Sequence, residues 1–580
     1  MILKDYLALM KIVFAVVFTA ALFSCANTNQ IGNHPPINPY QYSIEKRMEV
    51  VNGAVVSAHP LASLAGVQML KKGGNAVDAA IATQWALAVV YPGAGNIGGG
   101  GFMVAQLKDG KRLALDYREM GPAAAHRDMY LDEQGNAVAA KSLNGHLAAG
   151  VPGTVAGLFE SLKYAKLPMS VLIQPAIEFA EKGFVLTERE ARSLNAERAD
   201  FEKYNTRPTA FVKQNKWKTG DTLVQTELAN TLKRIQQAGS KGFYEGETAE
   251  LVVEEMKRGN GIISLLDLKN YKAKFREPFT FHYRGYEVLG MPMPSSGGLL
   301  LNQMLKMTEP FDIGSMGFQT PASVQLMTEI ERRAYADRAK YMGDADFYKV
   351  PVEQLRSDTY LKSRMADYKS GVAGNSTVTR DGIVPGYESE ETTHLSVIDK
   401  DGSAVAVTTT LNGGYGSRTV VGGAGFLLNN EMDDFSAKPG SPNMFGAVGG
   451  KANAIAPGKR MPSSMAPTIV LKNGKPYLVV GTPGGTTIPT SVYQNILNII
   501  DFGLSTEDAV NRPKFHHQWL PDRIDLEKGF NETTKQALEK MGYKTNERGA
   551  YSRSEIIKVL PNGKFEAVAD RRGDDSAAGY

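Results

Sequence analysis

The amino-acid sequence predicts an α+β fold in one large globular chain. Apolar residues recur with helical spacing from about residue 150 to 380, whereas strand patterns dominate after residue 392. Separate runs of helices and strands are typical of α+β folds. The chain has 580 residues, of which 43% are apolar and 22% charged, so it can bury a large core and shows no bias toward disorder.

The first residues differ from the rest of the chain. Residues 12–23 form an apolar run after Lys11 that is shorter than the roughly 20 residues of a membrane-spanning helix. This pattern is typical of a signal peptide, here residues 1–24. An acidic residue ahead of the run leaves two starts open, Met1 and Met10.

Cys25 follows this run and is the only cysteine of the chain. The stretch "LFSC" resembles a bacterial lipoprotein cleavage box, which predicts an exported, periplasmic protein attached to a bacterial membrane only through lipid on Cys25. The alternative is that the cysteine is lost with a cleaved leader. If Cys25 carries lipid, the mature protein has no thiol for a disulfide, for catalysis or for a metal. Residues 25–47 are polar and rich in Pro and Asn, which predicts a flexible tether.

The net charge and the spacing of potential metal ligands limit the kinds of partner that the protein is expected to bind. The 65 basic and 61 acidic residues give a net charge of only +4, and no Lys/Arg block predicts a nucleic-acid surface. No metal-ligand spacing is evident, so neither a metal nor another cofactor is expected. Small molecules are the expected partners.

Two packed helices are predicted where the fold begins, near Met48. The first continues through Leu70 to a stop at Gly73-Gly74, and the second begins at Ala76 and ends before Pro92. Further helices are predicted over 154–165, 170–182, 226–239 and 323–342.

Gly93, Gly95 and Gly98 match the pattern G-x-G-x-x-G. A dinucleotide-binding loop follows a strand and opens a helix, whereas this loop follows a helix and precedes the strand-like "GFMVAQL". The prediction is therefore a loop in which the backbone packs closely, which glycine permits.

A β-hairpin is predicted after residue 392. A two-residue turn would mix polar and apolar side chains on each face. A three-residue loop over 400–402, with its glycine in the left-handed region, places Leu395 opposite Val407 and Val397 opposite Val405 on one apolar face. The second register is the one predicted.

The other face of this hairpin makes Thr392 the cross-strand neighbour of Thr410. A threonine hydroxyl needs a base to become a nucleophile, and a free α-amine on the same residue is such a base. That amine exists only if the Glu391–Thr392 bond is cut, and residues 370–391 have the Gly, Pro, Ser and acidic composition of an exposed, mobile loop. The hypothesis is a self-cleaving N-terminal nucleophile. The alternative is that threonine is simply common in strands.

Eight sequence blocks resemble the γ-glutamyltranspeptidase family, also called glutathione hydrolases. In chain order they are "LKKGGNAVDAAIA", "GNIGGGGFMV", "LDYREMGPAAA", "TTHLSVIDKDGSAVAVTTTLN", "NNEMDDFSAKPG", "RMPSSMAPTIV", "GTPGGTTIPTSV" and "NRPKFHHQWLPD". The resemblance spans about residues 48–580. It implies a four-layer αββα sandwich of the N-terminal nucleophile hydrolase type, made as a proenzyme that cuts itself into a large subunit, 48–391, and a small catalytic subunit, 392–580. The two subunits would form a heterodimer.

The resemblance also implies the reaction. The Thr392 hydroxyl would attack the carbonyl of Glu391, and later the γ-glutamyl amide of glutathione and other γ-glutamyl compounds. The resulting ester would pass its γ-glutamyl group to water or to an acceptor amino acid or dipeptide, and which of these is preferred stays open. The alternative is a related self-processing acylase of the cephalosporin acylase type, which would lack the lid and the acids that bind an α-amino group.

Roles for the other site residues follow from the same resemblance. Thr410 would hydrogen-bond the nucleophile, and Gly484 and Gly485 would form an oxyanion hole from backbone N–H groups. Three residues would hold the substrate α-carboxylate: Arg118, Ser463 and Ser464. Three others would hold its α-ammonium: Asn412, Glu431 and Asp434.

Two further segments concern the lid over the site and a pair of histidines. Residues 438–454 resemble the lid loop of some bacterial members, but Phe445 stands where such members often carry a tyrosine, so a gate made by that hydroxyl is not implied. His516 and His517 lie next to Phe515, and a packed, hydrogen-bonded pair is predicted rather than a catalytic one.

Overall fold

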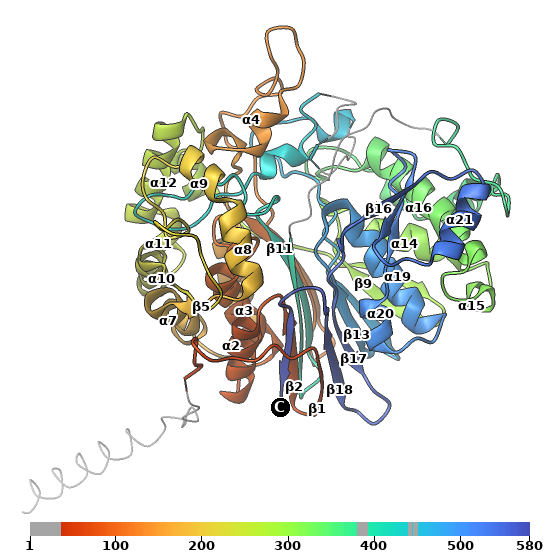
Figure 1. Ribbon diagram of the computed structural model, residues 1–580, viewed down its shortest axis with the longest axis horizontal. Helices are drawn as coiled ribbons and strands as arrows, with labels where there is room; N and C mark the ends of the chain where they lie inside the picture. Colours follow the sequence, from red (N-terminus) through yellow and green to blue (C-terminus); the bar gives the residue numbers. More distant parts are fainter. Residues whose placement is uncertain (1–35, 380–391, 439–442, 445–449) are drawn as a thin grey trace, which may run out of the picture.

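The computed structural model describes residues 36–379, 392–438, 443–444 and 450–580. Its centre consists of two large β-sheets that stand side by side, with a group of helices beyond each (Figure 1). The predicted signal peptide, Cys25, Glu391 and Phe445 lie outside the described residues. The mixed α+β class predicted from the sequence is confirmed.

Both large sheets have seven strands, and all neighbouring strands in them are antiparallel. The first sheet has the order β19-β2-β10-β11-β3-β4-β7, and the second has the order β1-β18-β17-β13-β12-β9-β8. The strands of the first sheet are β2 (Gly53–Ser57), β3 (Gly100–Gln106), β4 (Arg112–Asp116), β7 (Lys274–Arg276), β10 (Thr393–Asp399), β11 (Ala404–Thr410) and β19 (Ser576–Gly579). Those of the second are β1 (Arg47–Val50), β8 (Phe279–Tyr283), β9 (Tyr286–Gly290), β12 (Thr468–Lys472), β13 (Lys475–Gly481), β17 (Glu555–Val559) and β18 (Phe565–Ala569).

Helices flank each sheet (Figure 1). Beyond the first sheet lie α2 (Pro60–Lys71), α3 (Ala76–Val90), α5 (Thr154–Ser161), α6 (Met169–Leu172), α7 (Gln174–Lys182), α8 (Glu188–Ala196), α9 (Arg198–Tyr204), α10 (Thr226–Ala238), α11 (Lys241–Tyr244) and α12 (Gly246–Gly259). Beyond the second lie α14 (Gly297–Thr308), α15 (Ile313–Met316), α16 (Pro321–Tyr341), α18 (Asp358–Arg364), α19 (Ile488–Ile500), α20 (Thr506–Asn511) and α21 (Glu532–Lys540). The predicted helix over 170–182 is two helices, because Pro175 cannot donate a backbone hydrogen bond and starts α7 anew.

Strands from before and after the predicted cleavage site are interleaved. β10 and β11 lie between β2 and β3, and the four strands β18, β17, β13 and β12 lie between β1 and β9. The segments 48–391 and 392–580 therefore share both sheets and both large apolar cores.

The hairpin of β10 and β11 has the predicted register. Leu395 pairs with Val407 and Val397 with Val405, and these residues belong to the same apolar core as α3, which packs on both strands. Gly402 has φ +87° and closes a three-residue turn, in which the N–H of Ser403 donates to Asp399 Oδ1 at 2.9 Å. The predicted apolar face is confirmed.

The opposite face of the hairpin lies against the second sheet. A Cβ added at Gly481 of β13 would lie 2.2 Å from the His394 ring, so glycine is required where the two sheets meet. This contact fixes the end of β10 that carries Thr392.

The glycine-rich loop before β3 packs as predicted. A Cβ at Gly95 would lie 2.1 Å from the carbonyl oxygen of Leu87, and one at Gly98 would lie 2.1 Å from that of Leu427. The loop leads from α3 into β3, where Gly100 pairs with Thr410. Its close packing therefore positions the end of β11.

Part of the predicted tether is attached to the fold. The Tyr42 hydroxyl donates to Val185 O at 2.6 Å, and Lys46 Nζ donates to Asp570 O and Gly573 O, both at 2.9 Å. The ordered fold thus begins several residues before Met48. Among the described residues, no helix has both the length and the hydropathy needed to cross a bilayer.

Candidate active site

The predicted site residues gather at one pocket. Of those that the structure describes, only Gly484 is absent from its lining, and it is the direct neighbour of a lining residue. The lining comprises Arg118, Arg338, Thr392, Thr410, Asn412, Glu431, Asp434, Ser463, Ser464, Met465, Gly485, Thr486 and Ile488. The fold thus joins segments that are more than 300 residues apart in the chain.

Thr392 lies directly before β10 and is 3% exposed. The outermost pair of the hairpin is Thr393 with Thr409, and its register places Thr392 and Thr410 next in line on the two strands. Thr410 Oγ1 accepts a hydrogen bond of 2.8 Å from the N–H of Asn412. The geometry suits a threonine that is held by a second hydroxyl.

Gly484 and Gly485 lie where β13 leads into a short 3₁₀ helix, η5 (Gly485–Thr487), and then α19. Their φ angles of +130° and +55° favour glycine. No acceptor among the described residues takes a hydrogen bond from either N–H, as is usual at the start of a helix. Two unused donors at a helix N-terminus can stabilise a developing anion.

Arg118 is buried and pairs with the acids of η3 (Glu431–Asp434). Its Nη2 lies 2.5 Å from Asp434 Oδ2, its Nη1 contacts Glu431 Oε1, and Nη1 lies 3.6 Å from Glu119 Oε2. The residues predicted to hold opposite charges of a substrate therefore bind one another in this structure. A zwitterionic group could insert between them and meet both charges.

The acids of this cluster are shifted toward their neutral forms. Burial raises the pKa of Glu119 to about 7, because the opposing effect of Arg118 offsets only part of the loss of water. Burial also raises the pKa of Glu431 well above its usual range. Both oxygens of Glu119 and Oε2 of Glu431 have no hydrogen-bond partner among the described residues. The cluster can therefore retain a proton near neutral pH.

Ser463 and Ser464 are held as hydrogen-bond acceptors. Ser463 Oγ accepts from the N–H of Met465 at 3.1 Å, and Ser464 Oγ accepts from Arg338 Nη2 at 3.0 Å. Neither hydroxyl donates to any residue that the structure describes. Their hydrogens are available to an anion in the pocket.

Comparison with known proteins identifies the family. The family model described as gamma-glutamyltranspeptidase matches residues 62–580. The chain belongs to the γ-glutamyltranspeptidase family. It is 46% identical over 580 residues to the glutathione hydrolase proenzyme of Escherichia coli strain K12, covering 99% of each chain.

Solved structures support the fold. A γ-glutamyltranspeptidase from Helicobacter pylori aligns with a TM-score of 0.55 and 43% identity, covering 59% of this chain and 96% of that one. A cephalosporin acylase from Bacillus halodurans aligns with a TM-score of 0.79 and 27% identity, covering 95% of this chain and 99% of that one. Both support the mixed fold with two large antiparallel sheets.

Sequence analysis did not find two charged residues of this family member's site: Arg338, which lines the pocket, and Glu119, which contacts Arg118 without lining the pocket. Glu119 follows Arg118 directly, and that adjacency at a strand end was the available signal. Arg338 lies in the charged run "ERRAYADRAK" of α16, and the sequence of this run does not show which of its charged side chains reaches the pocket.

The described part of the predicted lid contacts the acids of the pocket. Asn443 Nδ2 donates to Asp434 Oδ1, and the N–H of Met444 donates to Asp433 Oδ2, both at 2.7 Å. Burial raises the pKa of Asp433 to about 6. The segment is thus tied to Asp434, which pairs with Arg118, and to its neighbour Asp433.

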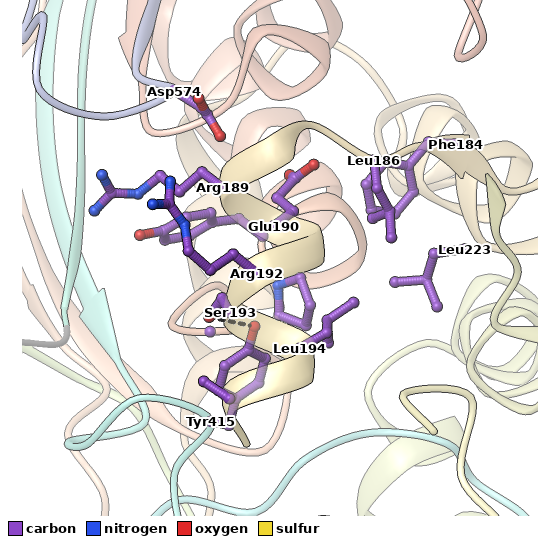
Figure 2. A pocket seen from close by; sticks show the side chains of 14 residues that line it. Phe184, Leu186, Arg189, Glu190, Arg192, Ser193, Leu194, Leu223, Tyr415 and Asp574 are labelled. Atoms are coloured by element: carbon purple, nitrogen blue, oxygen red, sulfur yellow. Dashed lines mark hydrogen bonds between the residues drawn. The ribbon is translucent and has the colours of Figure 1, made fainter. Parts of the chain in front are cut away.

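A larger pocket of about 350 Å³ lies beside α8 and shares no lining residue with the first (Figure 2). Tyr415 reaches it from the loop that follows β11, and its hydroxyl donates to Ser193 Oγ at 2.9 Å. Its N–H donates to Gly93 O at 2.8 Å. These bonds anchor a loop in which Asn412 and Tyr415 have φ of +77° and +59°. Asn412 is thereby presented to the active-site pocket.

His516 and His517 form the packed pair that the sequence predicts. His516 hydrogen-bonds Thr490 and Gln518, and His517 Nε2 lies 3.2 Å from Asp522 Oδ1. Burial lowers the pKa of both imidazoles to about 4. Neither lines the pocket. No cluster of three metal-binding side chains occurs within the described ranges.

Proposed function

We propose that this protein is a γ-glutamyltranspeptidase that hydrolyses glutathione and transfers γ-glutamyl groups. Membership of the family over residues 62–580 supports the activity. The single structural observation that supports it is the meeting of Thr392, the Gly484–Gly485 turn and the Arg118 cluster at one pocket.

The proenzyme first cleaves itself between Glu391 and Thr392. The Thr392 oxygen attacks the carbonyl carbon of Glu391, the peptide C–N bond breaks and the nitrogen takes a proton, which leaves an ester on the hydroxyl. Breaking of that C–N bond frees the α-amine of Thr392, and hydrolysis of the ester by water then frees the hydroxyl and the carboxylate of Glu391. The product is a heterodimer of 48–391 and 392–580 with a four-layer fold of the N-terminal nucleophile type, for which two facing sheets flanked by helices are the support.

The same hydroxyl then acts on substrate. Its proton passes to the α-amine of Thr392, and its oxygen attacks the γ-carbonyl carbon. The N–H groups of Gly484 and Gly485 stabilise the oxyanion. The amide C–N bond breaks as the leaving amine takes the proton, and water or an acceptor amine resolves the γ-glutamyl ester.

Charge pairing at the pocket explains the choice of a γ-glutamyl group. Its α-carboxylate accepts from Arg118 and the two serine hydroxyls, and its α-ammonium donates to Glu431, Asp434 and Asn412. Each new charge-assisted hydrogen bond replaces a contact within the Arg118 cluster, so no charge is left buried alone.

A cephalosporin acylase type of activity is the second candidate, and the structural likeness across 95% of the chain favours it. A glutaryl group has no α-ammonium, so it would offer no cation to Glu431 and Asp434. Both acids are present and line the pocket. Parallel assays with γ-glutamyl-p-nitroanilide and a glutaryl cephalosporin separate the two: faster release from the second would reject the first proposal.

Replacement of the nucleophile tests self-processing and turnover together. Thr392→Ala is expected to give one uncut chain that releases no p-nitroaniline from γ-glutamyl-p-nitroanilide, whereas Thr392→Ser, which keeps a hydroxyl, is expected to be cut. Two subunits of normal size from Thr392→Ala would reject the mechanism. Addition of glycylglycine to the assay of the wild type then shows whether an amine competes with water.

We also propose export and lipid attachment through Cys25. The support is the apolar run 12–23 followed by "LFSC". Intact mass and membrane fractionation of the wild type and Cys25→Ser provide the test. An identical soluble protein from both would reject the anchor.

A further inference from the structure

Arg338 is a second guanidinium at the active-site pocket. It lies in the last turn of α16 and is partly buried. Its Nη2 donates to Ser464 Oγ at 3.0 Å, and its Nε donates to Ser296 Oγ at 3.2 Å. Both partners are neutral hydroxyls, so these contacts leave its positive charge uncompensated.

The two guanidiniums of the pocket differ in their balance of charge. Arg118 contacts three carboxylates, those of Glu119, Glu431 and Asp434. Arg338 forms no ion pair with any carboxylate in the described part of the chain, and Asp434 affects it only at longer range. The cluster around Arg118 is therefore rich in acid, and Arg338 is the cation that remains for an incoming anion.

The Arg338 guanidinium also orients the hydroxyl group of Ser464. A guanidinium has N–H donors and no acceptor. Ser464 Oγ must therefore accept from Arg338, which turns the Ser464 hydrogen away from α16, and no described residue receives that hydrogen. The hydrogen is left to point into the pocket.

Ser296 extends this effect to the neighbouring serine. Its hydroxyl accepts from Arg338 and donates to Ser463 O at 2.7 Å, and its N–H donates to the same oxygen at 2.8 Å. One side chain on α16 thus braces both residues of the Ser463-Ser464 turn.

We propose that Arg338 determines specificity for the α-carboxylate of the γ-glutamyl group. Because the charge of Arg118 is balanced by neighbouring acids, Arg338 supplies positive charge to the carboxylate. It also aims the Ser464 hydroxyl at that carboxylate. This rests on the function proposed above. Donors whose α-carboxylate is free are favoured over donors that carry an ester, an amide or a hydrogen in its place.

Substrates with and without the carboxylate provide the test. We expect Arg338→Gln to lower kcat/KM for L-γ-glutamyl-p-nitroanilide by about 10- to 100-fold, mainly through KM, since it removes one charged partner of the carboxylate. The value for 4-aminobutyryl-p-nitroanilide, which keeps the amino group and lacks the carboxylate, is expected to change by less than about threefold. The inhibition constant of L-glutamate is expected to rise with KM, and that of 4-aminobutyrate to stay constant.

Two further variants separate charge from orientation. Arg338→Lys keeps the charge but not the fork that reaches both serines, so its loss is expected to be smaller than that of Arg338→Gln. If Arg338 acts through Ser464, the combined loss in Arg338→Gln/Ser464→Ala is smaller than the product of the separate losses. Arg333→Lys, on the same helix but paired with Glu329 and Asp367, is the control and is expected to leave substrate preference unchanged.

Rates are expressed per mole of processed enzyme, so that slow maturation is not mistaken for weak binding. Equal losses on both anilides, or no loss on either, would overturn the inference. A wild type that releases no p-nitroaniline would instead reject the proposed function, and the two failures are therefore distinct.

Discussion

Replacing Arg118 by lysine is the sharpest test of the charge cluster. The guanidinium donates to the carboxylates of Glu431 and Asp434 and to the carbonyl oxygens of Met461 and Pro462. A lysine ammonium is a single point of charge and cannot hold both acids at once. Loss of one charge-assisted hydrogen bond costs about 1.5–3 kcal/mol, which corresponds to about a 10- to 150-fold change in an equilibrium constant.

We therefore expect kcat/KM of Arg118→Lys for γ-glutamyl-p-nitroanilide to fall by about 10²-fold, with a lower midpoint of thermal unfolding. Steady-state kinetics and a thermal melt of the processed protein measure the two effects. Arg333→Lys is the matched control, because Arg333 is also a buried arginine between two acids but does not line the pocket. It should lower the midpoint without changing kcat/KM. A kcat/KM within about threefold of wild type in Arg118→Lys would refute the reasoning.

Three further outcomes follow from the geometry. Gly484→Ala places a Cβ 2.7 Å from Tyr551 O at a φ of +130°, so the turn must shift; kcat is expected to fall by about 10²–10³, and an unchanged kcat would contradict an oxyanion role. Tyr415→Phe removes the bond to Ser193 that anchors the Asn412 loop, which predicts a rise in KM of about 2- to 10-fold, whereas an unchanged KM would mean that the loop is held by its backbone alone. Glu119 has a usual pKa of 4.5 that burial raises to about 7, so between these values the folded protein holds a proton that the unfolded chain has lost, and the free energy of unfolding falls as pH rises. Glu119→Gln is expected to reduce this fall by up to about 2 kcal/mol between pH 5 and pH 7 in denaturant titrations, and an identical pH dependence would exclude Glu119 as its source.

Local patterns were sufficient to predict much of the framework. Side-chain alternation on β10 and β11 admits one register with a single apolar face, so Thr392 could be placed opposite Thr410 before the sheets were known. The glycine-rich loop was separated from a nucleotide site by its order, helix then strand. Both features depend only on neighbours in sequence.

The remainder depends on contacts between distant segments. No local rule indicates that Arg118 binds Glu431 and Asp434, since these residues meet only when β4 and η3 are assembled. Arg338 is hidden for the same reason: its partners Ser296 and Ser464 come from two loops on either side of the cleavage site. The attachment of Tyr42 and Lys46 was missed because the composition of a tether says nothing about a complementary surface.

The interleaved sheets prevent exchange of subunits between enzyme molecules. Once the chain is cut, neither product alone contains a complete sheet, because β10 and β11 are flanked on both sides by strands of the other product. Partners chosen at folding are therefore kept for the lifetime of the enzyme. Two weakened variants that are both cut, one changed at Arg118 and the other at Gly484, will not restore activity when the mature proteins are mixed.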